Sequence, residues 1–223
     1  MKKLMFGLFA GIGISLAVGA AEMDYGLTPQ AVAPDVYAFI GKTEDFDTTN
    51  GGNIVNTGFI VAQDGVIVVD TGPSLRYGRQ MREAITRVTS KPIVMVINTH
   101  HHPDHFLGNQ AFADLPIATL AEIQKGIVTE GNAFAENLFR MSGDWMSGTE
   151  VVAPTQTLVA GTQTIGGRRV RVMALDGHTG ADLALVDETS GVLFAGDLVF
   201  DHRAPTTPHA DVDHWQSSLA ILE

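Results

Sequence analysis

Four histidines and a carboxylate fall within six consecutive residues, and this stretch constrains the chain more than any other. It consists of His100, His101, His102, Pro103, Asp104 and His105. The apolar run from Ile93 to Ile97 precedes it, is rich in β-branched residues and predicts a buried strand. The stretch is therefore expected in a loop at the carboxyl end of that strand, the edge where open α/β sheets place their sites.

The residue types in this stretch indicate metal binding. Imidazole and carboxylate groups suit zinc, with iron and manganese as competitors. His100 and His102 alternate, so in an extended backbone both point to the same side, while Asp104 and His105 follow a turn at Pro103 and can face a second centre. A run of histidines can also be a non-specific metal-binding tract, but the preceding strand and the proline turn favour a formed site.

Three further positions place similar groups where an expected strand ends. Asp70 closes the apolar run 66–69, and Gly177-His178 and Gly196-Asp197 each stand where a strand runs into a loop. Glycine allows the sharp turn that such a position needs. Taken alone, a strand-end aspartate is usually a helix cap or a turn residue, and this alternative applies to Asp70 as well. Together with the histidine stretch, in this order, His178 and Asp197 strongly indicate one shared site.

The pattern His-x-His-x-Asp-His after a strand resembles the signature of the metallo-β-lactamase superfamily, and the resemblance runs from about Asn53 to Leu222. It implies about two Zn²⁺ ions per chain, with iron or manganese as alternatives. It also implies the ligands: His100, His102 and His178 for one metal, Asp104 and His105 for a second, Asp197 bridging, and Asp70 beneath the metals. Asp104 would be the catalytic group that orients the attacking water or accepts its proton.

The expected fold is α/β, a four-layer αβ/βα sandwich of the metallo-β-lactamase type with the site between two stacked halves. Hydrophobic periodicity and turn residues predict strands at 36–40, 59–61, 66–69, 93–97, 117–119, 183–186 and 192–195, and a hairpin over 162–172. They predict helices over 75–89, from 108 to 113, over 120–147 and through Trp215, Leu219 and Leu222. Residues 22–34 read as an extended lead-in. The aromatic residues and methionines of 120–147 favour core packing over a substrate pocket.

The resemblance also points to a departure near the C-terminus. Members with six ligands usually supply a last histidine on a Gly-His loop well after the bridging aspartate, and no Gly-His follows Asp197 here. We therefore expect the sequence to be incomplete at its C-terminal end, with a terminal strand also missing. The alternative is that one of His202, His209 and His214 takes the place of the missing ligand.

Composition bounds the location and the partners. Residues 1–20 begin with two lysines, continue as an apolar run and end in small residues, which predicts a cleaved signal peptide, export to the periplasm and a mature domain over 22–223. An uncleaved membrane anchor is the alternative, but the apolar run is short for a membrane span, so we expect no stable membrane insertion of the mature form. The net charge of −11 argues against nucleic acid as a partner, and the absence of cysteine excludes a thiolate ligand or nucleophile.

The expected activity is hydrolysis of an ester, thioester or lactam of a small molecule by a metal-activated water. The segments 56–61, 69–72, 97–100 and 194–200 look most like the quinoprotein relay system zinc metallohydrolase group, a resemblance that implies a role near quinoprotein dehydrogenases. Two alternatives stay open: a di-iron redox protein of the same fold, and a non-catalytic metal-binding protein.

Overall fold

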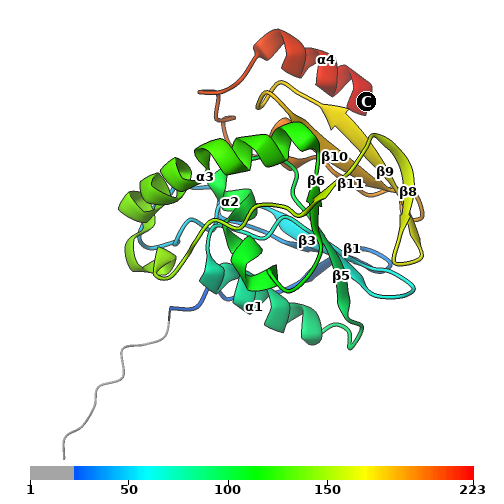
Figure 1. Cartoon of the computed structure of the whole chain (residues 1–223), viewed down its shortest axis with the longest axis horizontal. Coiled ribbons are helices and arrows are strands. Elements are labelled where there is room, and N and C mark those ends of the chain that lie inside the picture. Colours follow the sequence, from blue (N-terminus) through cyan, green and yellow to red (C-terminus); the bar gives the residue numbers. More distant parts are fainter. Residues whose placement is uncertain (1–22) are drawn as a thin grey trace, which may run out of the picture.

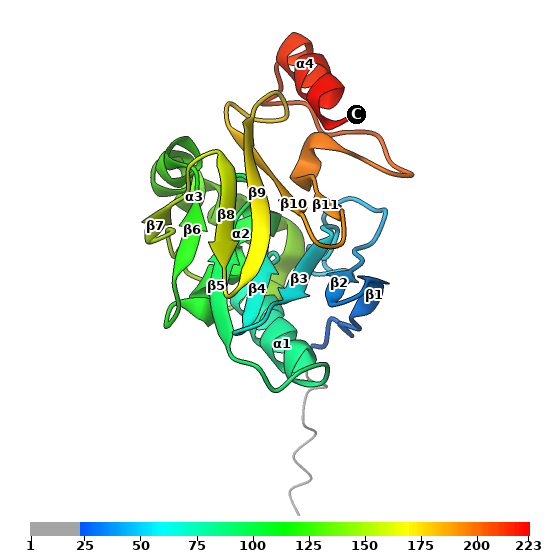
Figure 2. The same ribbon diagram turned by 90° about the vertical axis from the view of Figure 1, so that its right-hand side faces the viewer.

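Two β-sheets face each other in the computed structural model, which describes residues 23–223 (Figure 1, Figure 2). Sheet A has seven strands in the order of the chain: β1 (Gln30–Ala33), β2 (Val36–Phe39), β3 (Thr57–Val61), β4 (Val66–Val69), β5 (Ile93–Ile97), β6 (Ile117–Thr119) and β7 (Gln156–Thr157). Sheet B has four strands: β8 (Gly161–Ile165), β9 (Arg168–Leu175), β10 (Asp182–Asp187) and β11 (Leu193–Phe194).

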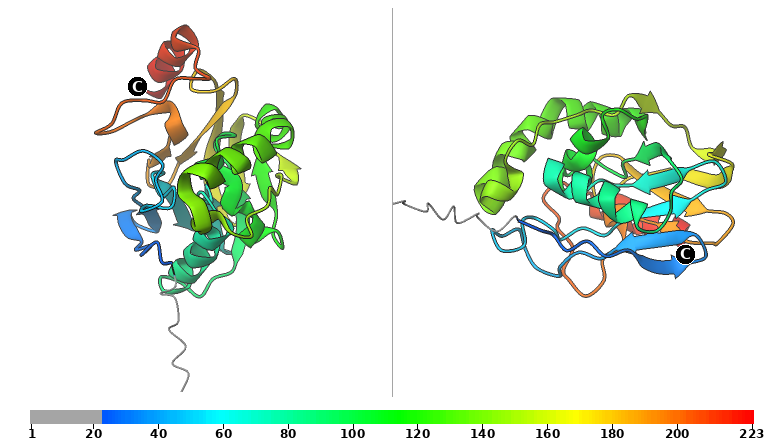
Figure 3. Two further views of the ribbon diagram at one scale, coloured as in Figure 1. Left: turned by 90° about the vertical axis from the view of Figure 1, so that its left-hand side faces the viewer. Right: turned by 90° about the horizontal axis from the view of Figure 1, so that it is seen from below.

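Helices cover the outer faces and the end where the sheets meet. They are α1 (Leu75–Thr86), α2 (Pro103–Phe106), η1 (Leu107–Phe112), α3 (Ala121–Ser142), η2 (Gly143–Met146), η3 (Gly196–Leu198) and α4 (Val212–Leu222). Helix α1 lies under sheet A, α4 lies on the far side of sheet B, and α3 runs beside α2 (Figure 1, Figure 3). In the described range 23–223, none of these helices is both long and apolar enough to cross a membrane.

The alternation of side chains along the strands explains the layers. In β4, Ile67 and Val69 face sheet B, where they join a core that includes Val172 and Leu185. Val66 and Val68 point the other way, into a second core with Met81 of α1. Every one of these strand residues is at most 2% exposed, because strands covered on both faces bury both sets of side chains.

The far side of sheet B has its own smaller core. Ala184 of β10 packs there with Leu198 and with Trp215 of α4. The order of layers is thus α1, sheet A, sheet B, α4, which confirms the expected four-layer αβ/βα sandwich.

Most predicted elements are present, with differences at short segments. The lead-in 22–34 contains β1, which pairs with β2, and β7 is a two-residue edge strand that the sequence pattern did not reveal. Helix α1 ends at Thr86, earlier than expected, with Arg87 as its C-cap. Where a turn was expected at Pro103, the short helix α2 begins, and the helix expected from Gly108 is the 3₁₀ segment η1. The predicted signal segment 1–20 lies outside the described residues.

Two neighbouring ion pairs of sheet B differ sharply in burial. Arg168 donates through Nε and Nη2 to both carboxylate oxygens of Asp187, at 2.8 and 2.6 Å, and the Asp187 side chain is 0% exposed. Ser190 also donates to Asp187. The adjacent pair, Arg169 with Glu188, is 3.0 Å apart and lies at the surface, with side chains 68% and 26% exposed.

We expect Asp187→Ala to lower the free energy of unfolding by about 3 kcal/mol, because it leaves a largely buried guanidinium without its partner. Burial alone would raise the pKa of Asp187, but hydrogen bonds from Arg168 and Ser190 hold that pKa below its ordinary value. The Asp187–Arg168 ion pair therefore stabilises the fold at neutral pH, and this stabilisation is lost only as the pH falls below about 4.

Urea unfolding at several pH values measures this difference. Glu188→Ala is the matched control. It should lower the free energy of unfolding by less than about 1 kcal/mol, because the Arg169–Glu188 pair is exposed to solvent. Equal losses for the two variants at neutral pH would contradict the assignment.

Candidate metal centre

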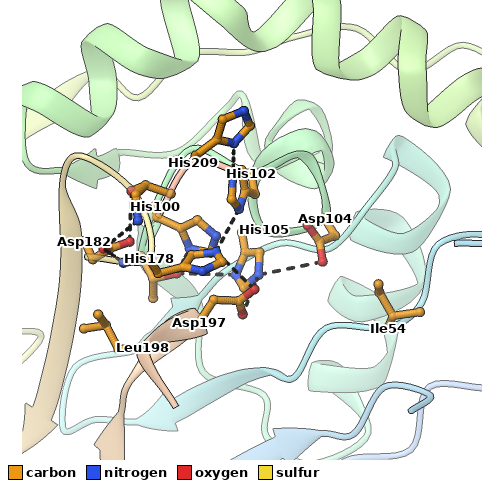
Figure 4. Close-up of polar contacts among 12 residues, drawn as sticks. Ile54, His100, His102, Asp104, His105, His178, Asp182, Asp197, Leu198 and His209 are labelled. Atoms are coloured by element: carbon orange, nitrogen blue, oxygen red, sulfur yellow. Dashed lines mark hydrogen bonds and ion pairs between the residues drawn. The ribbon is translucent and has the colours of Figure 1, made fainter. Parts of the chain in front are cut away.

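Strand ends from both sheets bring the predicted site residues together. Asp70 follows β4 and the histidine stretch follows β5, both in sheet A. His178 lies in the turn between β9 and β10, and Asp197 lies in η3 after β11, both in sheet B. Figure 4 shows the side chains of His100, His102, His105, His178 and Asp197 pointing toward one another.

Four of the predicted ligands form one tight group. One potential ligand atom from each of His100, His102, His178 and Asp197 lies within 4.8 Å of the others. His102 Nδ1 is 2.9 Å from His178 Nε2, and His178 Nε2 is 3.5 Å from Asp197 Oδ2. Three imidazoles and a carboxylate at such separations match the donor set and the number of ligands that zinc takes.

The remaining two predicted ligands lie next to this group. His105 Nε2 is 3.1 Å from Asp197 Oδ1 and 3.8 Å from Asp104 Oδ2. Asp197 therefore directs one oxygen toward His178 and the other toward His105 (Figure 4). One carboxylate is thus shared between His178 and His105.

Buried ring nitrogens without partners test whether the residues fit a metal. His100 Nε2 has no hydrogen-bond partner although its ring is fully buried, and the buried His105 Nε2 faces Asp197 Oδ1 at 3.1 Å without a formed hydrogen bond. The opposite nitrogens are occupied: His100 Nδ1 lies 3.1 Å from Thr99 Oγ1, and His105 Nδ1 lies 2.8 Å from Asp70 Oδ2. An unsatisfied buried polar atom is costly, and a cation would satisfy both nitrogens, so the residues fit a metal.

The electrostatics of three histidines favour the neutral imidazole that metal binding requires. Burial, reinforced by the neighbouring histidines, lowers the pKa of His100 well below its ordinary value. Burial and then His178 lower the pKa of His102 to about 2. Burial lowers the pKa of His178 to about 4, against the opposing effect of Asp197.

The carboxylates shift the other groups in both directions. Burial would lower the pKa of His105, but Asp197, Asp70 and Asp104 together raise it well above its ordinary value. Burial would raise the pKa of Asp197, but the nearby histidines, His105 first, lower it to about 2. Burial raises the pKa of Asp104 to about 6. Without a cation, the negative charge of Asp197 is thus balanced by His105.

Asp70 supports the cluster from below. Its carboxylate accepts hydrogen bonds from the Thr99 backbone N–H and the Thr99 hydroxyl, at 2.8 and 2.7 Å, besides contacting His105 Nδ1. The alternative role as a helix cap does not hold, because Ser74 is the N-cap of α1. A carboxylate behind a histidine fixes the ring and directs its other nitrogen toward a metal.

Asp182 is a supporting residue that the sequence analysis missed. Its Oδ2 accepts hydrogen bonds from the backbone N–H groups of His178 and Thr179, at 3.1 and 3.0 Å, and its Oδ1 accepts one from the Thr179 hydroxyl. This network holds the turn that presents His178. The spacing His-Thr-x-x-Asp is the local signal that could have predicted it.

The three late histidines do not complete the second group. His202 is exposed and faces Asp201, and His214 lies 2.8 Å from Asp176 on the surface. His209 contacts His102. Among residues 23–223, His105 is the one histidine paired with Asp104, so the alternative of a substitute ligand from this segment finds no support in the geometry.

The large apolar residues of 120–147 have three roles. Leu138 and Met146 belong to the core, as expected. Phe134 instead lies beside the site, with its ring centroid 5.8 Å from that of His102. Trp145 donates a hydrogen bond to the Thr48 carbonyl and so ties down the polar loop 44–52.

Comparisons with known proteins identify the family and agree with the fold. The family model for the metallo-beta-lactamase superfamily matches residues 50–223. The chain is 25% identical over 181 residues to a linear primary-alkylsulfatase of a Pseudomonas species, covering 67% of this chain and 34% of that protein. It is 28% identical over 177 residues to the human acyl-coenzyme A thioesterase MBLAC2, covering 67% of this chain and 60% of that protein. The chain thus spans less than two thirds of both relatives.

A solved structure shows the same fold. The metallo-beta-lactamase from Pontibacter korlensis superposes with a TM-score of 0.69 at 20% identity, over 88% of this chain and 84% of that one. The matching family model is that of the superfamily as a whole, so the quinoprotein relay group stays a prediction. The family match over residues 50–223, the four-layer sandwich and the histidine–aspartate cluster lead to one conclusion: the chain belongs to the metallo-β-lactamase superfamily.

Proposed function

We propose that the chain is a zinc-dependent hydrolase with a dinuclear centre that cleaves an ester, thioester or lactam of a small molecule. The observation that carries the proposal is the position of Asp197. One of its oxygens lies 3.5 Å from His178 Nε2 and the other lies 3.1 Å from His105 Nε2. A carboxylate shared between two sets of buried donors is the feature expected of a bridging ligand.

The reaction class follows from the chemistry of the donors. Bound zinc supplies Lewis acidity, which makes water a nucleophile at neutral pH and polarises the bond under attack. His100, His102 and His178 would hold one ion, and Asp104 and His105 the other, with Asp197 between them. Asp70 holds the His105 ring in place through Nδ1, so that Nε2 stays directed into the site.

Asp104 is the proposed acid–base group. Its side chain is buried beside the cluster and its Oδ2 lies within 3.8 Å of His105 Nε2. From this position Oδ2 can accept a proton from the attacking water and can later return a proton to the leaving group. No other carboxylate of the group is free for this role, because Asp70 is engaged with Thr99 and Asp197 lies between the two sets of histidines.

The relatives support a choice among substrates. The two relatives are an alkylsulfatase and an acyl-coenzyme A thioesterase. We therefore place thioesters and esters ahead of lactams. Phe134 beside His102 offers an apolar contact for the remainder of such a substrate.

Metal content tests the centre. Elemental analysis of purified protein supplied with zinc should give about two ions per chain. His178→Ala should remove at least one of them, because His178 belongs to the group that shares Asp197. His214→Ala, a histidine on the surface, is the matched control and should bind as much zinc as the wild type. Zinc near zero in the wild type, unchanged by His100→Ala, would refute the proposed centre.

Activity tests the reaction. We expect chelator-sensitive cleavage of at least one member of a panel: an acyl-coenzyme A, S-lactoylglutathione, a lactone, a primary alkyl sulfate and a chromogenic cephalosporin. Asp104→Asn should lower kcat by about 100-fold or more while circular dichroism stays close to that of the wild type. Zinc content is measured on the same sample, because Asp104 is also a proposed ligand.

Asp201→Asn, an exposed aspartate outside the cluster, is the control and should leave kcat unchanged. A zinc-loaded wild type that cleaves no member of the panel would contradict the hydrolase proposal. Iron in the purified protein with a visible absorption band would favour the redox alternative.

Export is part of the proposal and rests on the sequence of residues 1–20. The lysines at the start, the apolar run and the small residues before Ala21 predict cleavage at or near that residue. N-terminal sequencing of protein from a periplasmic fraction should therefore begin at or near Ala21. Protein that begins at Met1 and stays in the cytoplasm would contradict the prediction.

A further inference from the structure

His209 lies next to a proposed metal ligand although it belongs to neither ligand group. Its Nδ1 is 2.9 Å from His102 Nε2, the ring nitrogen of His102 that points away from the cluster (Figure 4). The ring centroids of the two histidines are 5.2 Å apart. His209 stands in the segment between η3 and α4, 107 residues from His102 along the chain.

Which ring nitrogen of His102 carries the proton determines whether His209 acts as a hydrogen-bond acceptor. His102 Nδ1 faces His178 Nε2 at 2.9 Å, inside the ligand group, and must offer a lone pair there if it binds a cation. A neutral imidazole carries one proton, so this proton then resides on Nε2. The nearest partner of Nε2 is His209 Nδ1, which can accept the hydrogen bond.

We propose that His209 is a positioning residue: it accepts a hydrogen bond from His102 Nε2–H and thereby fixes the tautomer and ring angle that present Nδ1 to the metal. The inference rests on the proposed function, since it assigns His102 as a ligand. It resembles the role of Asp70 behind His105, with an imidazole in place of a carboxylate.

The surrounding chain holds His209 in this position. On its C-terminal side, the backbone N–H of Asp211 donates to the Gly177 carbonyl at 2.9 Å, which joins the segment to the turn that carries His178. Ala210 N–H donates to the Thr207 carbonyl at 3.1 Å and closes a turn around His209. Trp215 then packs against the His178 ring, with centroids 5.2 Å apart.

A third ring packs against both histidines. The Phe134 ring from α3 lies edge-on to His102 and to His209, at 5.8 Å from each centroid. Elements from three parts of the chain thus meet at the outer face of His102: the strand-end loop, α3 and the segment before α4. Loss of His209 would leave His102 Nε2 facing solvent and free the ring to rotate.

The test uses three variants of the full chain. His209→Ala removes the acceptor. His209→Asn restores it, because the Asn carbonyl oxygen can occupy the region of the His Nδ1 atom. His202→Ala is the matched control, since His202 lies in the same segment but its side chain is 85% exposed and faces Asp201.

Two measurements are made on each variant. Competition with a chelator gives the zinc affinity, and ¹⁵N–¹H correlation spectra of histidine-labelled protein give the ring tautomer of His102.

We expect His209→Ala to weaken zinc binding by about 10- to 100-fold without changing the number of ions bound at saturation. His209→Asn should recover most of the affinity, and His202→Ala should match the wild type. The His102 Nε2–H signal should be present in the wild type and in His209→Asn, and lost or mixed with the Nδ1–H form in His209→Ala.

The outcomes separate this inference from the proposed function. Wild-type affinity and an unchanged His102 tautomer in His209→Ala would overturn the positioning role while leaving the hydrolase intact. Loss of one whole ion per chain in His209→Ala would also overturn it, because His209 would then be a ligand. A wild type that binds no zinc would refute the proposed function, and with it the role assigned to His209.

Discussion

The buried carboxylate of Asp70 is the constraint on which the arrangement of the site depends. Asp70 is 1% exposed and adopts a positive φ of 57°, which is unfavourable for a residue with a side chain. The hydrogen bonds from Thr99 and the contact with His105 compensate for both costs. In doing so they join the end of β4, the end of β5 and the start of α2. The histidine stretch therefore takes its position from a residue 30 positions earlier in the chain.

Thr99 extends the same constraint to the second sheet. Its carbonyl accepts a hydrogen bond from Leu183 N–H at 2.7 Å, which ties β10 to the loop after β5. Gly196 approaches Thr99 so closely that an added Cβ would lie 2.9 Å from the Thr99 side chain, and its φ is +54°. Glycine is thus required next to Asp197 for reasons of both space and conformation. Contacts of one threonine link both halves of the sandwich, so the two ligand groups share one frame.

The features of the fold and the site that the sequence predicts are those with a pattern of neighbouring residues. The buried strands, the hairpin over 162–172 and the six ligand candidates each have a pattern within a few residues, and the structure brings those candidates together. The role of His209 has no local signal, because it depends on a contact across 107 positions. The strand β7 also escaped the sequence analysis, because two residues paired at a sheet edge carry too little periodicity to detect.

The distribution of charge explains why the fold and a cation are coupled. The site concentrates four imidazoles and three carboxylates in a region from which water is largely excluded. In such a region, charging one group makes it costlier to charge a neighbour with the same sign. His105 and Asp197 offset each other, but His100, His102 and His178 are held neutral by burial, and the lone pairs of their inward nitrogens share no common donor. A cation at their centre would interact with all these lone pairs at once and with the Asp197 carboxylate. Free energy of metal binding would then appear as free energy of folding, because the unfolded chain does not hold these donors together.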